Sequence, residues 1–342
     1  MTSARTVREA TRGDAAAIAA FVRRRDDATP FHLPAWSAAV ERACGQRAHW
    51  LLAEDRGGAI AGVLPLTQMR SPLFGRALVS AGFAVGGGVL GEGAASLSAA
   101  AIGLAIRLRV PTVELRGGPS LGGWTIDDTT YLGFARDLAA DDAAQLQAIP
   151  RKQRAEVRKA LAMDGLEVVT GRCRRAAEEH YAVYAESVRN LGTPVFPRAL
   201  MREVLETMDA DVLTVRHRGQ AVASVLSLYH GGTVYPFWGG GTAAARRLRA
   251  NELMYFALMR HARAVGCTRF DFGRSKAGTG PAAFKKNWGF AGEPLRYAMW
   301  NAGAPRVVNP LDPRYARMVA AWRRLPLPVA NTLGPWISRG LG

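Results

Sequence analysis

Cysteine and long apolar runs are scarce in this chain of 342 residues. Its three cysteines, Cys44, Cys173 and Cys267, are odd in number and far apart, which argues against a disulfide framework or a structural zinc site. The six histidines show no metal-ligand spacing, so we predict no metal. The longest small-apolar runs, 77–91 and 97–108, are broken by glycine or arginine and are too short to span a bilayer. No apolar core of a signal peptide follows the first residues, so we expect a cytoplasmic protein, with the inner face of the membrane as a second location.

Acidic residues are outnumbered, and lysine is rare. The chain has 45 basic and 28 acidic residues, a net charge of +17. Residues 1–150 hold 15 basic and 14 acidic residues (+1), whereas residues 151–342 hold 30 and 14 (+16). An anionic partner is therefore expected to meet the second part. The excess of arginine over lysine is equally expected from a GC-rich genome. All five lysines lie in the second part: Lys152, Lys159, Lys276, Lys285 and Lys286.

A degenerate repeat runs through the chain. Segment 55–66 (DRGGAIAGVLPL) matches segment 217–228 (HRGQAVASVLSL) at seven of twelve positions. A Thr-Pro turn with an aromatic residue precedes each segment, and a strand with a central acid, Glu114 or Asp271, follows each. The three landmarks recur at offsets of 164, 162 and 157 residues, far longer than a solenoid unit of about 20–50 residues. The sequence therefore predicts two copies of one whole domain.

Each copy has the same predicted order: helix, Thr-Pro turn, helix, strand, Arg-Gly turn, strand, further strand, helix and strand. In the second copy these elements are expected at 176–189, 197–208, 212–216, 221–229, 233–238, 251–266 and 268–273. Hairpins followed by a helix and a returning strand predict an α+β fold with mixed, mostly antiparallel sheets flanked by helices. We place domains at 1–150 and 151–310 and a basic, aromatic tail at 311–342. His261, on the apolar face of its predicted helix, is expected in the core.

The stretch 270–290, FDFGRSKAGTGPAAFKKNWGF, is the richest in reactive and charged groups. It leaves a strand, passes through a loop of Gly, Ser and Thr, and enters a short helix that begins near Pro281 and stops at Gly289. Loop amides, hydroxyls and cations at a helix start suit a phosphate or a carboxylate. A glycine-rich turn with solvated lysines is the other interpretation. The residues assigned to anion or donor binding are Arg274, Ser275, Lys276, Thr279, Lys285 and Lys286.

Within this stretch, FDFGRSK, GTG and FKKxWGF resemble the C-terminal signature of FemAB-type proteins, most closely those associated with exosortase (PEP-CTERM) exopolysaccharide systems. The segments 149–158, 190–194 and 251–255 fit the same resemblance, which covers residues 29–300. FemAB-type proteins are built from two tandem GNAT (acyl-CoA N-acyltransferase) folds, so the resemblance implies the duplication that the repeat predicts. It also implies transfer of an acyl or aminoacyl group to an amine, with acyl-CoA or aminoacyl-tRNA as co-substrate and no required cofactor.

Two features of the family are missing. No insertion is long enough for the helical hairpin that peptidoglycan-bridge members often use for tRNA. The GNAT pyrophosphate loop, Gln/Arg-x-x-Gly-x-Gly/Ala, is expected before the helix at 251, where this chain has GGGTAAARRLRA (239–250). The glycines precede the arginines there, so the sequence leaves the donor open between CoA and tRNA.

Acyl transfer to an amine needs a proton acceptor, donors for the tetrahedral oxyanion and a clamp for the donor's phosphates. Simple GNAT enzymes often use a tyrosine on the short helix, but Phe284 holds that place here. Asp271, on the strand face away from two phenylalanines, is therefore the candidate catalytic residue; an ion pair with Arg269 or Arg274 is the alternative. The first copy, with Glu114 instead, lacks the lysine cluster and is expected to be catalytically silent. The residues assigned to the substrate cleft are Tyr235, Trp238, Glu252, Tyr255 and Trp288.

Two basic segments lie outside this stretch. In the helix 151–159, Arg151, Arg154 and Arg158 follow i, i+3, i+7 spacing and share one face. This face is expected either to contact a polyanion, such as tRNA or a lipid diphosphate sugar, or to be solvated. The segment 322–339 mixes aromatic, aliphatic and basic residues. It either rests on an anionic membrane surface or packs against its domain, and its prolines and glycine are expected to interrupt any long helix.

The sequence thus favours an N-acyltransferase that acts on an amine of an anionic cell-envelope polysaccharide or lipid-linked precursor, with peripheral membrane contact as a further expectation. The alternatives are a non-catalytic protein that binds tRNA or another polyanion, and a membrane-peripheral scaffold of polysaccharide export. We expect no DNA partner.

Overall fold

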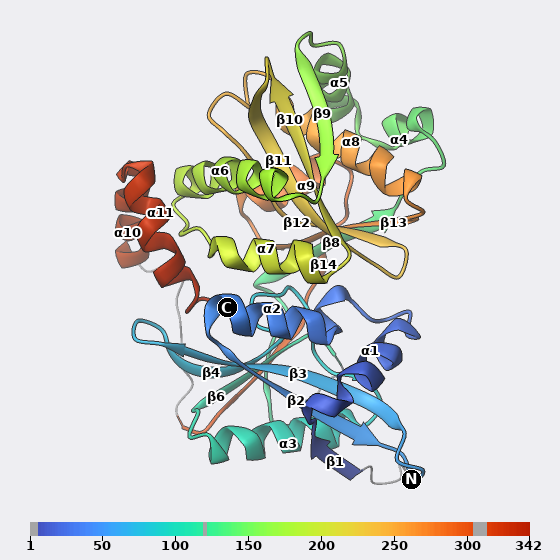
Figure 1. Ribbon diagram of the computed structural model, residues 1–342, viewed down its shortest axis with the longest axis vertical. Coiled ribbons are helices and arrows are strands. Elements are labelled where there is room, and N and C mark those ends of the chain that lie inside the picture. Colours follow the sequence, from blue (N-terminus) through green and yellow to red (C-terminus); the bar gives the residue numbers. More distant parts are fainter. Residues whose placement is uncertain (1–5, 119–121, 304–312) are drawn as a thin grey trace. The chain divides into compact units, whose positions relative to one another are not determined.

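The two copies of the repeat form β-hairpins in the computed structural model, which describes residues 6–118, 122–303 and 313–342. The chain divides into two compact units. Unit 1 comprises Met1–Thr130, Leu295–Asn309 and Trp336–Gly342. Unit 2 comprises Tyr131–Pro294 and Pro310–Pro335, so residues 131–150 belong to unit 2 and not to the first domain that the sequence analysis delimits. Each unit has one mixed sheet flanked by helices (Figure 1), which confirms the predicted α+β architecture.

Unit 1 contains a sheet with the strand order β1-β2-β3-β4-β6-β15-β7, and β5 also pairs with β3. These strands are β1 (Thr6–Glu9), β2 (Arg47–Glu54), β3 (Ile60–Ser71), β4 (Gly75–Ser80), β5 (Leu90–Gly91), β6 (Thr112–Arg116), β7 (Thr125–Asp127) and β15 (Tyr297–Asn301). The helices are η1 (Arg12–Asp14), α1 (Ala15–Arg23), η2 (Pro30–His32), α2 (Pro34–Cys44) and α3 (Ala94–Arg107). Leu51 and Leu64 join the core under α3, whereas their neighbours Leu52 and Val63 join the core under α1. The central strands are therefore buried on both faces.

Unit 2 contains a sheet with the order β14-β8-β13-β12-β11-β10-β9. Its strands are β8 (Tyr131–Asp137), β9 (Leu166–Gly171), β10 (Ala210–His217), β11 (Gln220–His230), β12 (Thr233–Gly241), β13 (Arg269–Lys276) and β14 (Glu293–Pro294). Its helices are α4 (Asp142–Ala148), α5 (Arg151–Leu161), α6 (Arg174–Leu191), α7 (Arg198–Thr207), α8 (Ala250–Ala264), α9 (Gly280–Asn287) and α10 (Pro313–Arg324); α11 (Leu327–Ser338) begins in unit 2 and ends in unit 1. Every element predicted for the second copy is present, with ends within three residues of the expected ones.

The repeat corresponds to a shared topology. In unit 1, β2 and β3 form a hairpin, β4 follows, and α3 leads to β6, which pairs with β4 in parallel. In unit 2, β10 and β11 form a hairpin, β12 follows, and α8 leads to β13, which pairs with β12 in parallel. Glu114 and Asp271 therefore lie on equivalent return strands. The duplication inferred from segments 55–66 and 217–228 agrees with this correspondence.

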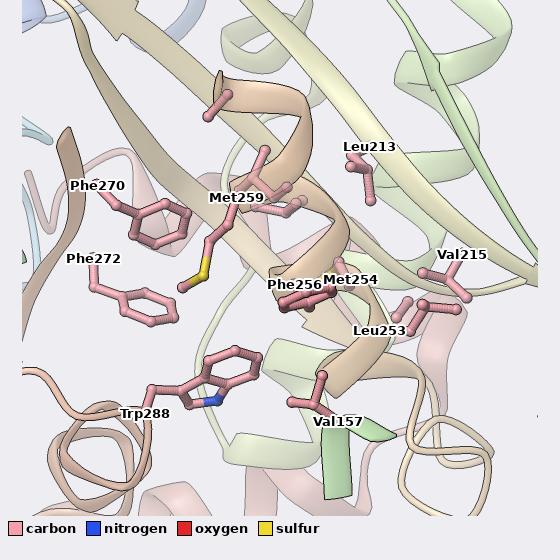
Figure 2. Packing of buried hydrophobic residues seen from close by; sticks show 14 of the residues in the cluster. Val157, Leu213, Val215, Leu253, Met254, Phe256, Met259, Phe270, Phe272 and Trp288 are labelled. Carbon is pink, nitrogen blue, oxygen red and sulfur yellow. The ribbon is translucent and has the colours of Figure 1, made fainter. Parts of the chain in front are cut away.

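The core of unit 2 lies between the sheet and α8 (Figure 2). Phe270 and Phe272 of β13 point toward the α8 side chains, with Met259 and Trp288 beside them. On the opposite face, His180 of α6 lies 3.0 Å from the Ser224 hydroxyl, so α6 covers the other side of the sheet. Since side chains alternate along a strand, Asp271 lies on the face opposite to the two phenylalanines, as predicted.

His261 does not lie in the core. Its Nε2 atom is 2.7 Å from Oδ2 of Asp211, and about a quarter of its side chain is exposed. The prediction from helical periodicity was wrong because the carboxylate on β10 gives the imidazole a polar partner, which periodicity within one helix does not reveal. Among the residues that the structure describes, no helix is long and apolar enough to cross a membrane.

Candidate functional site

The parallel strands β12 and β13 separate soon after they meet. They pair at Thr233–Arg269 and Val234–Phe270. Beyond these pairs β12 stays bonded to β11, and β13 stays bonded to β8. Backbone N–H and C=O groups are obligatory hydrogen-bonding groups. The two diverging edges therefore offer a place where an extended ligand with amide groups can lie between the strands.

A bulge in β13 lies at this divergence. The register with β8 shifts between Asp271 and Arg274, and Gly273 adopts a φ of 67°. The backbone N–H of Gly273 donates to Oδ1 of Asp271 at 2.8 Å. Lys285, from α9, donates through Nζ to the carbonyl oxygens of Gly273 and Arg274 at 3.1 and 2.9 Å. The bulge thus brings a carboxylate and an ammonium together, and the left-handed φ explains the glycine.

Burial perturbs both charged groups at the bulge. Burial raises the pKa of Asp271, although the Gly273 N–H and the nearby Lys285 charge act in the opposite direction. Burial also lowers the pKa of Lys285 to about 8, although the Asp271 charge opposes this change. Tyr235 shares the environment, since burial and the Asp271 charge raise the pKa of its phenol. Both shifts at the bulge bring proton exchange closer to neutral pH, a property of groups used in acid–base chemistry.

Tyr255, on α8, packs close to β12, β13 and α9. Its ring packs against Phe272, Phe284 and Trp288, with centroid distances of 4.8, 5.6 and 6.1 Å. A Cβ placed on Gly239 of β12 would lie 3.1 Å from the Tyr255 hydroxyl, so the phenol lies against β12. Burial raises the pKa of Tyr255 to about 12. A phenol therefore lies beside Phe284, the position at which the sequence analysis found no proton donor; only the packing of α8 against α9 reveals it.

Three of the other four residues assigned to the cleft are buried. Trp288 has no exposed surface and belongs to the core of unit 2. Trp238 is 3% exposed, and its ring lies 6.3 Å from Phe196. Tyr235 is 9% exposed and faces Asp271. Glu252 lies in the first turn of α8 and is partly exposed.

The cationic side chains of the 270–290 stretch do not point to one common site. Lys285 points inward at the bulge, whereas the adjacent Lys286 is exposed, as expected for residues about 100° apart on a helix. The guanidinium of Arg274 lies 4.8 Å above the Tyr131 ring. Ser275 is buried, Lys276 is partly exposed, and the Thr279 hydroxyl donates to the Lys276 carbonyl at 2.6 Å. Joint anion binding by these six residues stays a prediction.

The loop before α8, residues 242–249, is closed by its own hydrogen bonds. The N–H groups of Ala245, Leu248, Arg249 and Ala250 donate to carbonyl groups at 242, 244, 246 and 245. The N–H of Ala243 donates to Oε1 of Glu186 at 2.7 Å. A pyrophosphate loop presents free amides to its ligand, but here most amides are used and a carboxylate is bound at the loop. These residues do not fit the pyrophosphate of CoA.

The basic helix predicted at 151–159 is α5. Arg151 and Arg158 are exposed. Arg154 is partly buried and donates to the side chain of Gln147, on α4. The three arginines therefore do not form one uninterrupted exposed row, and polyanion contact stays a prediction. Among the residues that the structure describes, no three His, Cys, Asp or Glu side chains gather as a metal site.

Comparison with known proteins identifies the fold. Residues 150–286 match the family model described as an acetyltransferase (GNAT) domain. A crystal structure of FemX superimposes with a TM-score of 0.66 at 14% identity, covering 92% of this chain and all of the other. The C-terminal domain (DUF2156) of a putative lysylphosphatidylglycerol synthetase from Agrobacterium fabrum gives 0.57 at 16% identity, with coverages of 90% and 96%. A tandem GNAT protein from the clavulanic acid biosynthesis pathway gives 0.53 at 14% identity, with coverages of 88% and 100%.

These likenesses establish a tandem GNAT fold. No curated protein gives a significant match to the chain.

Proposed function

We propose that this tandem GNAT-fold chain is an N-acyltransferase of the FemAB type, related to the exosortase-associated branch by its 270–290 signature. Unit 2 moves an acyl or aminoacyl group from an activated donor to an amine of a cell-envelope polysaccharide or lipid-linked precursor. The observation that carries the proposal is the bulge at the point where β12 and β13 diverge, where Asp271 and Lys285 both bond to the backbone of Gly273. The cytoplasm, at the inner face of the membrane, is the location at which such an acceptor would be met.

The reaction requires three proton movements. An ammonium acceptor must lose a proton before its nitrogen lone pair attacks the donor carbonyl. A C–N bond then forms, and the nitrogen, now positively charged, must lose a second proton. The C–S or C–O bond of the donor breaks, and the leaving thiolate or alkoxide takes up a proton. Asp271 accepts the first proton, which suits a carboxylate whose pKa burial has raised. Tyr255 donates a proton to the leaving group, since its phenol stays protonated at neutral pH, and the resulting tyrosinate takes up the second proton of the nitrogen.

Lys285 acts at the bulge and not as an exposed phosphate clamp. Its ammonium holds the carbonyl groups of Gly273 and Arg274 and lies close enough to Asp271 to favour the carboxylate. The aromatic rings of Phe134 and Phe272 lie 5.3 and 5.8 Å from Nζ and shield the site from water. Lys285 is thus a positioning residue for Asp271.

Unit 1 lacks this arrangement. Glu114, the equivalent acid on β6, accepts a hydrogen bond from Nε of Arg116 at 2.7 Å. Arg116 is itself 5% exposed and also donates to the carbonyl oxygens of Ala84 and Gly342. Because the carboxylate is held in an ion pair, we propose that unit 1 is catalytically silent and contributes to substrate binding.

The Asp271→Asn variant tests the base. The amide oxygen of the new side chain can still accept the Gly273 N–H, so the bulge is retained while proton transfer is lost. We expect kcat to fall about 10²–10⁴-fold, with little change in unfolding temperature. Asp137→Asn, on the neighbouring strand β8, is the matched control, because Asp137 is 80% exposed and pairs with Arg269. Full activity in D271N would contradict the assignment.

The Tyr255→Phe variant tests the acid separately. It removes one hydroxyl and keeps the ring contacts with Phe272 and Phe284. We expect a loss in kcat that is smaller for a donor with a thiol leaving group than for one with an alcohol, since a thiolate leaves without a proton more readily. Equal loss with both donors would contradict the role of proton donor.

The donor is tested by mass spectrometry of ligands that co-purify with the full chain, followed by transfer assays with acetyl-CoA and with aminoacyl-tRNA. Because the loop at 242–249 does not fit a pyrophosphate, we expect transfer from aminoacyl-tRNA and weak binding of CoA. Tight, stoichiometric binding of acetyl-CoA, with acetylation of an added amine and release of the CoA thiol, would reverse this choice of donor and retain the N-acyltransferase.

A second candidate function rests on α5, where Arg151 and Arg158 are exposed. A non-catalytic polyanion-binding protein would bind tRNA with a steep salt dependence and form no covalent product. The R151E/R158E variant would lose this binding. Transfer of a labelled acyl or aminoacyl group by the wild-type chain would exclude the non-catalytic alternative.

A further inference from the structure

Helix α11 buries its small residues and exposes its large apolar residues, the reverse of the pattern expected for a surface helix. Its small residues Ala330 and Ser338 are buried. Gly334 is buried too, and a Cβ there would lie 3.0 Å from the backbone N of Val195. The large apolar residues face outward instead, so the face that normally forms a core is exposed. These are Val329, Leu333 and Trp336, at i, i+4 and i+7, with exposed fractions of 41%, 44% and 50%.

The preceding helix, α10, continues this pattern. Met318 is 64% exposed, the largest value among the exposed large apolar residues of the described chain. On its inner side α10 packs against α6 (Figure 1), where a Cβ on Gly192 would lie 3.0 Å from the Val319 carbonyl oxygen. Packing against the domain, one of the two alternatives for this segment, is thus observed for its small or branched residues, whereas its large apolar residues remain exposed; contact with a membrane stays a prediction. Gly334 does not interrupt α11; it allows close packing.

The charge of this segment has one sign. Residues 313–342 contain five arginines and no aspartate or glutamate. Arg317, Arg324 and Arg339 are exposed. Exposed apolar side chains among cations, without acids, match the in-plane helices that bind anionic membrane surfaces. A second copy of the chain would bring like charges together at such a face, which disfavours self-association.

A hollow at the end of α11 adds a place for a headgroup. It has a volume of about 300 Å³, and Arg70, Leu73, Trp336 and Arg339 are among the residues that line it. Leu73, at the β3–β4 turn, is 56% exposed. Gln46 fixes the backbone around the hollow: its Nε2 donates to the carbonyl oxygens of Arg70 and Arg339 at 3.1 and 2.7 Å. Two guanidinium groups can bind a phosphate while the apolar residues enter the acyl region.

We propose that this hollow and the end of α11 that lines it form a docking surface for an anionic phospholipid bilayer. Arg70 and Arg339 bind lipid phosphates, and Leu73 and Trp336 insert at the headgroup–acyl boundary. Membrane binding by this surface needs no acyl transfer. Failure of this proposal therefore leaves the proposed enzymatic function untouched, and the reverse also holds.

The test is flotation of the full-length protein with vesicles of phosphatidylcholine, with and without phosphatidylglycerol. We expect binding to the phosphatidylglycerol vesicles and release at high salt. R70E/R339E should weaken binding at least about 25-fold, at about fivefold for each lost cation. R246E/R247E makes the same change in charge at exposed arginines of the loop before α8 and should bind like the wild type.

The apolar part is tested with L73S/W336S. We expect this variant to lose vesicle binding and to keep the wild-type unfolding temperature, because both side chains are exposed. Ile106→Ser on α3 is the matched control, since Ile106 is 63% exposed outside the surface. Absence of wild-type flotation, or equal losses in test and control variants, would overturn the proposal. So would a wild-type dimer, measured by sedimentation equilibrium, that L73S/W336S converts to monomer while vesicle binding is unchanged.

Discussion

Gly240, in the glycine run of β12, offers a sharp test of how closely α6 packs on the sheet of unit 2. A Cβ added at Gly240 would lie 2.6 Å from Cβ of Ser187 on α6, and nearer still to its hydroxyl. Rotation of the serine side chain moves the hydroxyl but not Cβ, so backbone must shift. Gly240→Ala should therefore lower the free energy of unfolding by about 1–3 kcal/mol, the usual cost of overpacking a core.

The assay is isothermal denaturation of the wild type, G240A, S187G and the double variant. S187G removes the atoms that clash, so the double variant should be more stable than the sum of the two single losses predicts. Gly171→Ala is the matched control in the same sheet, because its Cβ would lie 3.5 Å from Ala176, an ordinary contact. We expect G171A to leave stability unchanged or slightly raised. A G240A protein as stable as the wild type, or no coupling with S187G, would refute the packing argument.

Two further predictions concern pH. Burial lowers the pKa of His180 to about 3, below its ordinary value of 6.5. As the pH drops from 6.5 toward 3, the unfolded state binds a proton that the folded state does not, so the free energy of unfolding falls. H180L should flatten this fall in urea denaturation measured over a series of pH values. The hydrogen bond to Asp211 raises the pKa of His261, so its stabilisation is full below the ordinary histidine pKa and is lost as pH rises through the raised value. D211N should therefore cost about 1 kcal/mol in mild acid and less in alkali; a loss independent of pH would contradict the ionic pairing.

The order of helices and strands within each copy could be predicted from the sequence, because the repeat presents the same order twice. Segments 55–66 and 217–228 both begin in a hairpin turn and continue as a central strand. A central strand that is buried on both faces needs apolar residues at successive positions. This requirement keeps the sequences of the two strands similar. Alternation along β13 was also sufficient to separate Phe270 and Phe272 from Asp271.

The directions of individual polar side chains could not be predicted in the same way. Lys285 and Lys286 are adjacent residues of the same type, yet Lys285 donates hydrogen bonds to the carbonyl groups of the bulge and Lys286 faces solvent. Trp288 was assigned to a cleft because aromatic residues serve both clefts and cores, and only the packing of α9 decides between them. Tyr255 comes close to Phe284, 29 positions further along the chain, through the contact of two helices, for which the sequence holds no local signal.

The difference between the two halves resides in one irregularity of the return strand. In unit 1, β6 pairs with β15 in continuous register across Glu114, and the acid is left beside Arg116. In unit 2, the register of β13 with β8 shifts just after Asp271, and the freed carbonyl groups draw Lys285 inward. In a regular ladder the backbone groups bond to each other, and an acidic side chain pairs with a neighbouring side chain. A bulge instead leaves backbone carbonyl groups without a ladder partner, and these groups need a buried donor. Duplication thus accounts for the shared scaffold, and the bulge accounts for a buried acid–base pair in the second half.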